Sequence, residues 1–306
     1  MRTPQLKTPI LVLAFIRPEL TEKLFESIRR VRPLKLFVAI DGPRNENDKP
    51  LVDEVKKIFT KIDWPCQLKT FYKETNKGLK GGYIDTLDWF FSHVEDGIIL
   101  EDDCIPNNSF YWFCQELLEK YKHDDRIMQI AGSNCQRGWK RDNYSYYFSK
   151  SPYTWGWATW RRAWKTYSAD MKGYKEFKDK GYLKDVYPNF LERMVLKSNF
   201  KHIINGFQVW DPQWVYNIIY NNGLVIIPNE NLITNIGMSS NASNMTYLDK
   251  KRSLPTKELS FPLKHPPFMV ADRESDDRLF AWSFKQKIIN TFLRKTKLMH
   301  FFRFKN

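Results

Sequence analysis

Three adjacent carboxylates, Glu101, Asp102 and Asp103, follow a short apolar run at 97–100 in this chain of 306 residues. Adjacent negative charges repel one another, so the arrangement is unfavourable unless a cation lies close by. Mg²⁺ and Mn²⁺ prefer oxygen ligands, and proteins often hold them with one or two carboxylates and the phosphates of a substrate. The triplet therefore predicts a site for a metal-bound diphosphate, and a solvated acidic turn is the alternative interpretation.

Strand and helix patterns alternate over the first 132 residues and must position this triplet. Apolar residues at helical spacing separate short apolar runs, and Ser109 is expected to cap the helix after the triplet. This alternation predicts an α/β fold with a mostly parallel central sheet and helices on both faces. Ligands of such sheets bind beyond the carboxyl ends of the strands, where the triplet lies. The predicted strands are 10–15, 36–40, 66–72, 97–100 and 127–132.

The second half of the chain is less regular and richer in Trp, Tyr and Asn. Because no long Gly/Ser/Pro linker divides the chain, we expect one domain over 1–277. Its two halves would be 1–132 and 133–277, and a basic aromatic segment, 278–306, would follow.

Five segments stand in a recognisable order along the chain: PILVLAFIRP, VAIDG, NKGLKGG, IILEDDCIP and SPYTWGWATWRRAW. This order resembles the GT-A-fold glycosyltransferases of the N-acetylglucosaminyltransferase I type, and more closely the bacterial HlpA-like surface-glycan transferases. The resemblance covers roughly residues 8–240. It implies a Rossmann-like GT-A fold that binds the nucleotide in its first half and the acceptor in its second.

The resemblance also implies an activity. The expected enzyme is a metal-dependent, inverting hexosyl- or N-acetylhexosaminyltransferase. It would move a sugar from a nucleotide-diphosphate donor, UDP-linked, to a glycan or a lipid-linked acceptor in surface-polysaccharide assembly. The last acid of the family's triplet coordinates Mn²⁺, which matches Asp103, and Mg²⁺ is the alternative cation. The preceding acids, Asp102 and Glu101, would contact the ribose and the donor sugar.

Other donor-binding positions follow from the resemblance. Each has a plainer alternative: a surface Arg or Lys, an ordinary turn, or an aromatic residue packed in the core. Trp155 and Tyr153 would form a wall against a sugar ring, beside a glycine whose missing side chain allows close approach of the backbone. The remaining expected donor-binding residues are Arg17, Asp41, Asn76, Lys77 and Gly156.

Asp211 is the candidate catalytic base that the resemblance implies. An inverting transfer needs a carboxylate that deprotonates the attacking hydroxyl. Family members carry an acidic pair in a similar Trp-flanked setting, whereas this sequence has one Asp followed by Pro212. A helix that begins here, with Asp211 as its cap and Pro212 in its first turn, is a compatible structural role.

The net charge of +14 is concentrated in part at the end of the chain, because 278–306 holds eight Lys/Arg and no Asp or Glu. Aromatic residues alternate with these cations, so peripheral contact of 279–306 with an anionic membrane is one expectation. A helix that packs on the domain is the other. No nucleic-acid motif accompanies the charge. The chain has no CxxC pair and no signal-peptide pattern, and we expect a cytoplasmic protein, peripheral to the membrane if the tail binds it.

Two other functions fit parts of the pattern. A nucleotidyltransferase on a similar sheet would carry a Gly-rich loop after the first strand, but AFIRPE contains no glycine. A non-catalytic protein that binds a nucleotide sugar or a membrane would bind UDP without turnover.

Overall fold

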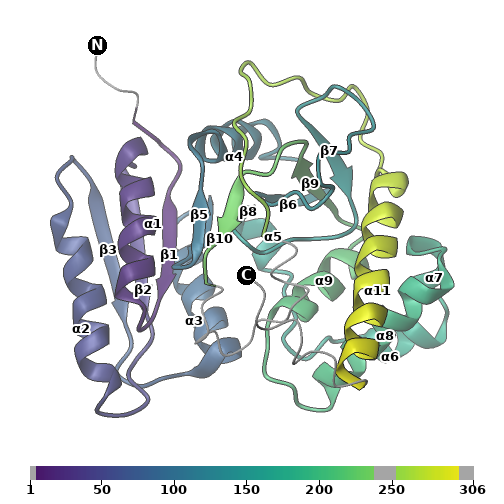
Figure 1. The fold of residues 1–306 in the computed structure, drawn as a ribbon, viewed down its shortest axis with the longest axis horizontal. Coiled ribbons are helices and arrows are strands. Elements are labelled where there is room, and N and C mark those ends of the chain that lie inside the picture. Colours follow the sequence, from purple (N-terminus) through teal and green to yellow (C-terminus); the bar gives the residue numbers. More distant parts are fainter. Residues whose placement is uncertain (1–4, 238–252, 296–306) are drawn as a thin grey trace.

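A computed structural model of the chain describes residues 5–237 and 253–295 (Figure 1). Its main sheet has eight strands in the order β3-β2-β1-β4-β8-β6-β9-β7. Helices cover both faces of this sheet, which confirms the predicted α/β class with a mostly parallel sheet.

The first half of the sheet is fully parallel. The four strands β1 (Ile10–Ala14), β2 (Lys35–Ile40), β3 (Gln67–Tyr72) and β4 (Asp96–Glu101) pair in parallel. Each of them begins and ends within one residue of its predicted bounds. The helices that connect them are α1 (Pro18–Val31), α2 (Asp48–Ile58, followed by a 3-10 turn, Phe59–Lys61) and α3 (Gly78–His93).

Two apolar cores lie on opposite faces of the sheet. Ile10 and Val12 of β1 belong to the core under α1, α2 and α4 (Asn108–Lys120), whereas Leu11 belongs to the core on the other side. Successive side chains of a strand point to opposite faces, so a strand buried on both faces is apolar without interruption. This explains why the apolar runs predicted the strands so closely.

The second half of the sheet is mixed. β8 (Trp157–Trp160) runs antiparallel between β4 and β6 (Ile127–Ala131), and β9 (Leu224–Pro228) pairs in parallel with β6. β7 (Tyr146–Ser149) forms the antiparallel edge. A separate two-stranded sheet pairs β5 (Cys104–Pro106) with β10 (Ile233–Asn235). Of the strands in this half, the sequence pattern predicted β6 but not β7, β8 or β9.

The helix after the triplet has a different cap from the one expected. The side chain of Asn107, rather than Ser109, accepts a hydrogen bond from the Phe110 amide at 3.1 Å. Ser109 lies inside the helix, where its hydroxyl and amide both contact the Glu258 carboxylate. Asn and Ser are similarly good caps, so only the chain path decides between them.

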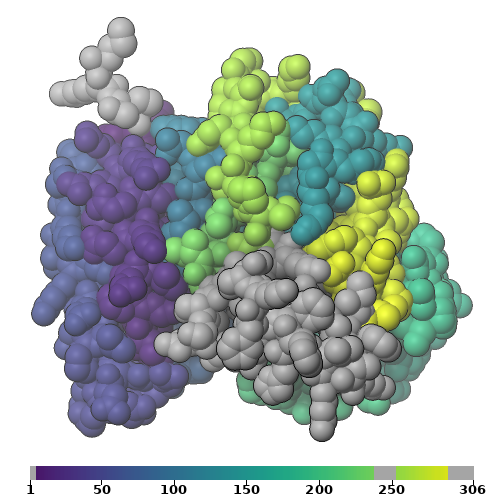
Figure 2. Space-filling view, in the orientation of Figure 1, coloured from purple at the N-terminus to yellow at the C-terminus, as the bar shows by residue number. Residues whose placement is uncertain are grey.

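Short helices and one long helix complete the fold. α6 (Tyr174–Asp179), α7 (Leu183–Val186) and α8 (Phe190–Ile204) gather on one side of the molecule, next to α11 (Arg273–Lys295) (Figure 1). The space-filling view shows this green-teal stretch beside the yellow α11 on the molecular surface (Figure 2). α5 (Arg161–Trp164) follows β8, and α9 (Asp211–Tyr220) precedes β9.

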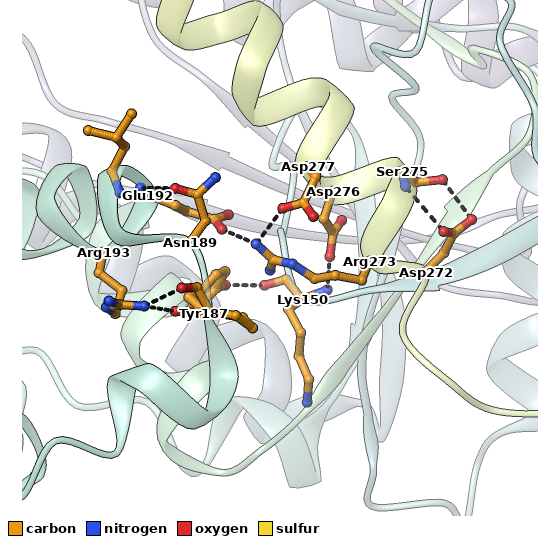
Figure 3. Close-up of polar contacts among 12 residues, drawn as sticks. Lys150, Tyr187, Asn189, Glu192, Arg193, Asp272, Arg273, Ser275, Asp276 and Asp277 are labelled. Carbon is orange, nitrogen blue, oxygen red and sulfur yellow. Dashed lines mark hydrogen bonds and ion pairs between the residues drawn. The ribbon is translucent and has the colours of Figure 1, made fainter.

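The start of α11 is anchored to the domain. Asp276 accepts hydrogen bonds from the Ser149 hydroxyl at 2.5 Å and the Lys150 amide at 3.1 Å, while Arg273 pairs with Glu192 of α8 (Figure 3). These anchors precede the basic segment 278–306, at whose start the Arg278 guanidinium lies 4.4 Å from the centre of the Trp139 ring. The last residues of the segment, 296–306, lie outside the described residues. Within the described ranges, none of the helices has the length and apolar character needed to cross a bilayer.

Candidate active site

The candidate site lies where the chain changes direction across the sheet. From β1 the chain moves to β2 and β3 on one side, and it then returns to β4 on the other side of β1. Such a switch point leaves a crevice beyond the carboxyl ends of the two strands, which is where open α/β sheets bind ligands. Arg17 follows β1 and the carboxylate triplet ends β4, so the topology brings them together.

Arg17 supplies the cation that the triplet requires. Its Nη1 atom lies 2.8 Å from Asp103 Oδ2, its Nε atom lies 3.2 Å from Asp102 Oδ2, and its other amino group contacts Asp102 Oδ1. Asp102 is buried, and burial raises its pKa to about 6 although Arg17 opposes the rise. The Arg17 side chain is 40% exposed, so a ligand in the crevice can reach it.

Asp103 is held from its other side by the segment around β10. Asn235 Nδ2 lies 3.3 Å from Asp103 Oδ1, and the Ile236 amide donates to the Asp103 carbonyl at 2.8 Å. A Cβ on Gly237 would lie 2.3 Å from Asp103 Oδ2. Sequence reasoning assigned neither chemistry nor a strand to these residues. The contact spans more than 130 positions and is set by the pairing of β5 with β10.

Asp211, of the second half of the chain, lies within electrostatic reach of Glu101 in the triplet. The pKa of Glu101 is raised to about 8, first by burial, then by Asp103 and Asp102, with a further contribution from Asp211. The pKa of Asp211 is itself raised by the surrounding protein, yet its side chain remains exposed. A carboxylate that solvent can reach, although protein surrounds it on other sides, is typical of a depression in the surface.

An aromatic stack fixes the position of Asp211. The ring of Trp210 lies 3.7 Å from that of Tyr83, at 11° between planes, and the Trp210 carbonyl accepts a hydrogen bond from the Tyr167 hydroxyl at 3.0 Å. Tyr83 in turn accepts from the indole of Trp157 at 3.1 Å. α9 begins at Asp211, but Trp210 is its cap residue and no side chain caps it. The capping role expected as an alternative is therefore not observed.

The predicted residues at the ends of β2 and β3 also lie together. The Lys77 amide donates to Asp41 Oδ1 at 3.2 Å, and Asn76 Nδ2 donates to the Gly42 carbonyl at 3.2 Å. A Cβ on Gly42 would lie 2.4 Å from the Thr75 backbone, so the close approach of the two turns requires glycine there. The Asp41 amide reaches the Ala14 carbonyl of β1 at 3.2 Å, which connects this group to the main crevice.

The aromatic loop before β8 approaches the end of β4. Because Trp157 pairs with Ile99, the residues before it lie beside the end of β4, and a Cβ on Gly156 would be 3.3 Å from Leu100 Cδ2. Gly156 has a φ of +60°, which favours glycine. Trp155 packs partly against one core and Tyr153 against the other, so the two rings lie on different sides of the sheet. They do not form a single continuous wall.

The carboxylates of this site could supply only some of the ligands that a metal ion needs. Among the described residues, no group of three or more His, Cys, Asp or Glu side chains is arranged to hold a metal ion. Asp103 and Asp102 offer carboxylate oxygens, and both now contact Arg17. These residues fit an ion that arrives with a substrate diphosphate and completes its shell with phosphate oxygens, as Mg²⁺ commonly does. They do not fit an ion held by protein ligands alone.

Comparisons with known proteins give weak similarities. No protein-family description and no curated protein matches the sequence. Solved structures with partial similarity include a 4-diphosphocytidyl-2C-methyl-D-erythritol synthase from Anaerococcus prevotii (10% identity, 72% of this chain and 88% of that chain, TM-score 0.39). Others are mouse xyloside xylosyltransferase 1 (9%, 71% and 82%, 0.36) and HddC from Yersinia pseudotuberculosis (7%, 51% and 77%, 0.29). These scores are too low to carry a functional argument, so the function must be argued from the site itself.

Proposed function

We propose that this protein is a metal-dependent glycosyltransferase that transfers a sugar from a nucleotide-diphosphate donor, UDP-linked, to a glycan or lipid-linked acceptor. The observation that carries the proposal is the arrangement of Arg17, Asp102 and Asp103 at the switch point, with the exposed carboxylate of Asp211 within electrostatic reach of the neighbouring Glu101. A cation and carboxylates suit a diphosphate with its metal ion, and a facing carboxylate suits a general base.

In this proposal each residue has a distinct task. Asp103 would hold the cation, which offsets the charge that develops on the leaving nucleotide diphosphate. Arg17 would exchange its carboxylate partners for phosphate oxygens, for which a guanidinium is equally suited. Asp41, with Asn76 and Lys77 close by, would face the nucleoside end of the donor.

Asp211 would accept the proton of the attacking hydroxyl. Its raised pKa favours this role because a base is more effective when its pKa approaches the working pH. Glu101 and Asp102 would contact the donor between Asp103 and Asp211, with Gly156 allowing close approach of the backbone. A single facing carboxylate supports an inverting reaction, in which the acceptor is activated directly and no covalent sugar intermediate is formed.

Calorimetric titration of UDP, GDP and TDP, each with and without Mn²⁺, tests the donor site. We expect one nucleotide to bind the wild-type protein only in the presence of Mn²⁺, and Asp103→Ala to lose that metal-dependent binding. Asp53→Ala is a matched control, since Asp53 is an exposed carboxylate on α2. Metal-independent binding, or no binding, would refute the triplet as the donor site, and equal binding by Asp103→Ala would refute Asp103 as the cation ligand.

A further inference from the structure

The outward face of α8 is unusually apolar for a surface helix. Seven of the fifteen large apolar side chains that are exposed in the described residues fall in the 39 positions 182–220. Single exposed apolar residues are ordinary, whereas a gathered set marks an interaction surface. The three largest exposures on α8 are those of Phe190 (64%), Ile204 (59%) and Met194 (52%).

These side chains share one face of the helix with two lysines. At 100° per residue, the five positions fall within an arc of roughly 80°, so they form one stripe along α8. We call this stripe the α8 outer face. It consists of Phe190, Met194, Lys197, Lys201 and Ile204, all exposed.

The opposite face of α8 is fixed to the domain. Glu192 is buried and pairs with Arg273 of α11, and Phe200 and Ile203 are buried in the core formed with α9 (Figure 3). The Asn189 side chain caps the helix by accepting from the Leu191 amide at 2.9 Å. α8 therefore cannot turn its apolar stripe inward without breaking a buried ion pair.

The charge that α8 itself carries after Glu192 has one sign. From residue 193 to residue 210 the sequence contains three Lys/Arg, namely Arg193, Lys197 and Lys201, and no Asp or Glu. The Arg193 guanidinium lies 5.8 Å from the centre of the Phe190 ring, so positive charge borders the apolar end of the stripe as well. Apolar side chains bordered by lysines complement a bilayer with anionic headgroups.

We propose that the α8 outer face docks the protein on an anionic lipid bilayer. Phe190, Met194 and Ile204 enter the interface, and Lys197 and Lys201 contact lipid phosphates. Phe207, which is 61% exposed, follows the helix and lies four positions before Asp211 in the sequence. That distance is at most about 14 Å for an extended chain, so docking brings the candidate active site close to the bilayer. The docking itself does not depend on the proposed glycosyl transfer.

Vesicle flotation of the full chain, without nucleotide or metal, tests the proposal. We expect binding to vesicles of phosphatidylcholine mixed with phosphatidylglycerol, and little binding to phosphatidylcholine alone. Lys197→Glu/Lys201→Glu and Phe190→Ser/Met194→Ser/Ile204→Ser should each lower the partition coefficient at least about tenfold. Circular dichroism and the midpoint of thermal unfolding verify that each variant is folded.

Two control variants test whether the loss of any exposed lysine or any exposed apolar side chain lowers vesicle binding. Lys57→Glu alters an exposed lysine of α2, and Val270→Ser alters an apolar side chain that is 67% exposed and does not belong to α8. Neither should change vesicle binding. Arg294→Glu/Lys295→Glu/Lys297→Glu tests the basic end of the chain as the rival surface. Wild-type binding by both α8 variants, loss of binding only in the rival variant, or equal binding to the two kinds of vesicle would each overturn the proposal.

Discussion

The two halves of the main sheet use different architectures, and the candidate site lies where they meet. In the first half, β3-β2-β1-β4 are parallel and are joined by regular helices. In the second half, β8 reverses direction and short helices replace the regular crossovers. Arg17 and the triplet come from the first half, whereas Asp211, Asn235 and Gly237 come from the second.

This comparison separates two tasks. A regular βα unit places charged residues reproducibly at a strand end, which suits a diphosphate and its cation. The irregular half supplies side chains that shape the other wall and hold Asp103 in place. Changes in the first half should therefore alter nucleotide binding, and changes around Asp211 should alter turnover.

The sharpest test of this division is Asp211→Asn. Removal of a general base should lower the rate of nucleotide release from the donor sugar about 100-fold or more, with nucleotide affinity unchanged. Steady-state kinetics and titration calorimetry on the same preparation measure both. Asp179→Asn, which changes an exposed carboxylate of α6, is the control. A full rate in Asp211→Asn would disprove the base assignment.

Gly237→Ala tests whether the second half positions Asp103. The added Cβ would lie 2.3 Å from Asp103 Oδ2, so the carboxylate must shift. We expect Mn²⁺-dependent nucleotide affinity to fall roughly tenfold, with a loss of about 1–3 kcal/mol in the free energy of unfolding. Gly81→Ala is the control for stability, because its nearest non-neighbouring atom would be 3.9 Å away. Unchanged affinity in Gly237→Ala would show that Asp103 does not depend on this contact.

Tyr83→Phe probes the connection between the halves through the aromatic stack. The change leaves the buried indole N–H of Trp157 without its acceptor, which should cost about 1–3 kcal/mol of unfolding free energy in urea titration. Tyr72→Phe, at an exposed tyrosine of β3, should stay within about 0.5 kcal/mol of the wild type. Equal stability of the two variants would mean that the hydrogen bond between Trp157 and Tyr83 does not stabilise the contact between the two halves.

The smallest effect concerns pH. Asp102 and Glu101 have folded-state pKa values of about 6 and about 8, above the ordinary values of 3.8 and 4.5. Between about pH 4 and about pH 8 the folded protein therefore binds more protons than the unfolded chain, and the free energy of unfolding decreases as pH rises. Urea titrations at several pH values across this range should show that decrease.

Asp102→Asn should flatten the lower part of this slope. Since a cation requires ionised carboxylates, Mn²⁺-dependent nucleotide binding should strengthen as pH rises through the same range. A stability that increases with pH across this window would contradict the assigned shifts.

The elements of the first half, and the chemistry at their ends, could be predicted from local sequence patterns. Strands buried on both faces must be apolar throughout, so 10–15 and 36–40 could be identified without knowledge of their neighbours. Glu101, Asp102 and Asp103 were also visible, because an acidic triplet after a buried strand implies a nearby cation.

Which side chains lie in contact depends on the long-range pairing of the strands. The sequence placed Arg17 near a nucleotide but gave no sign that it pairs with Asp102 and Asp103, since that contact depends on β1 lying beside β4. The support of Asp103 by Asn235 depends on the pairing of β5 with β10. Long-range pairing is set by the packing of the whole chain, and local patterns carry little information about it.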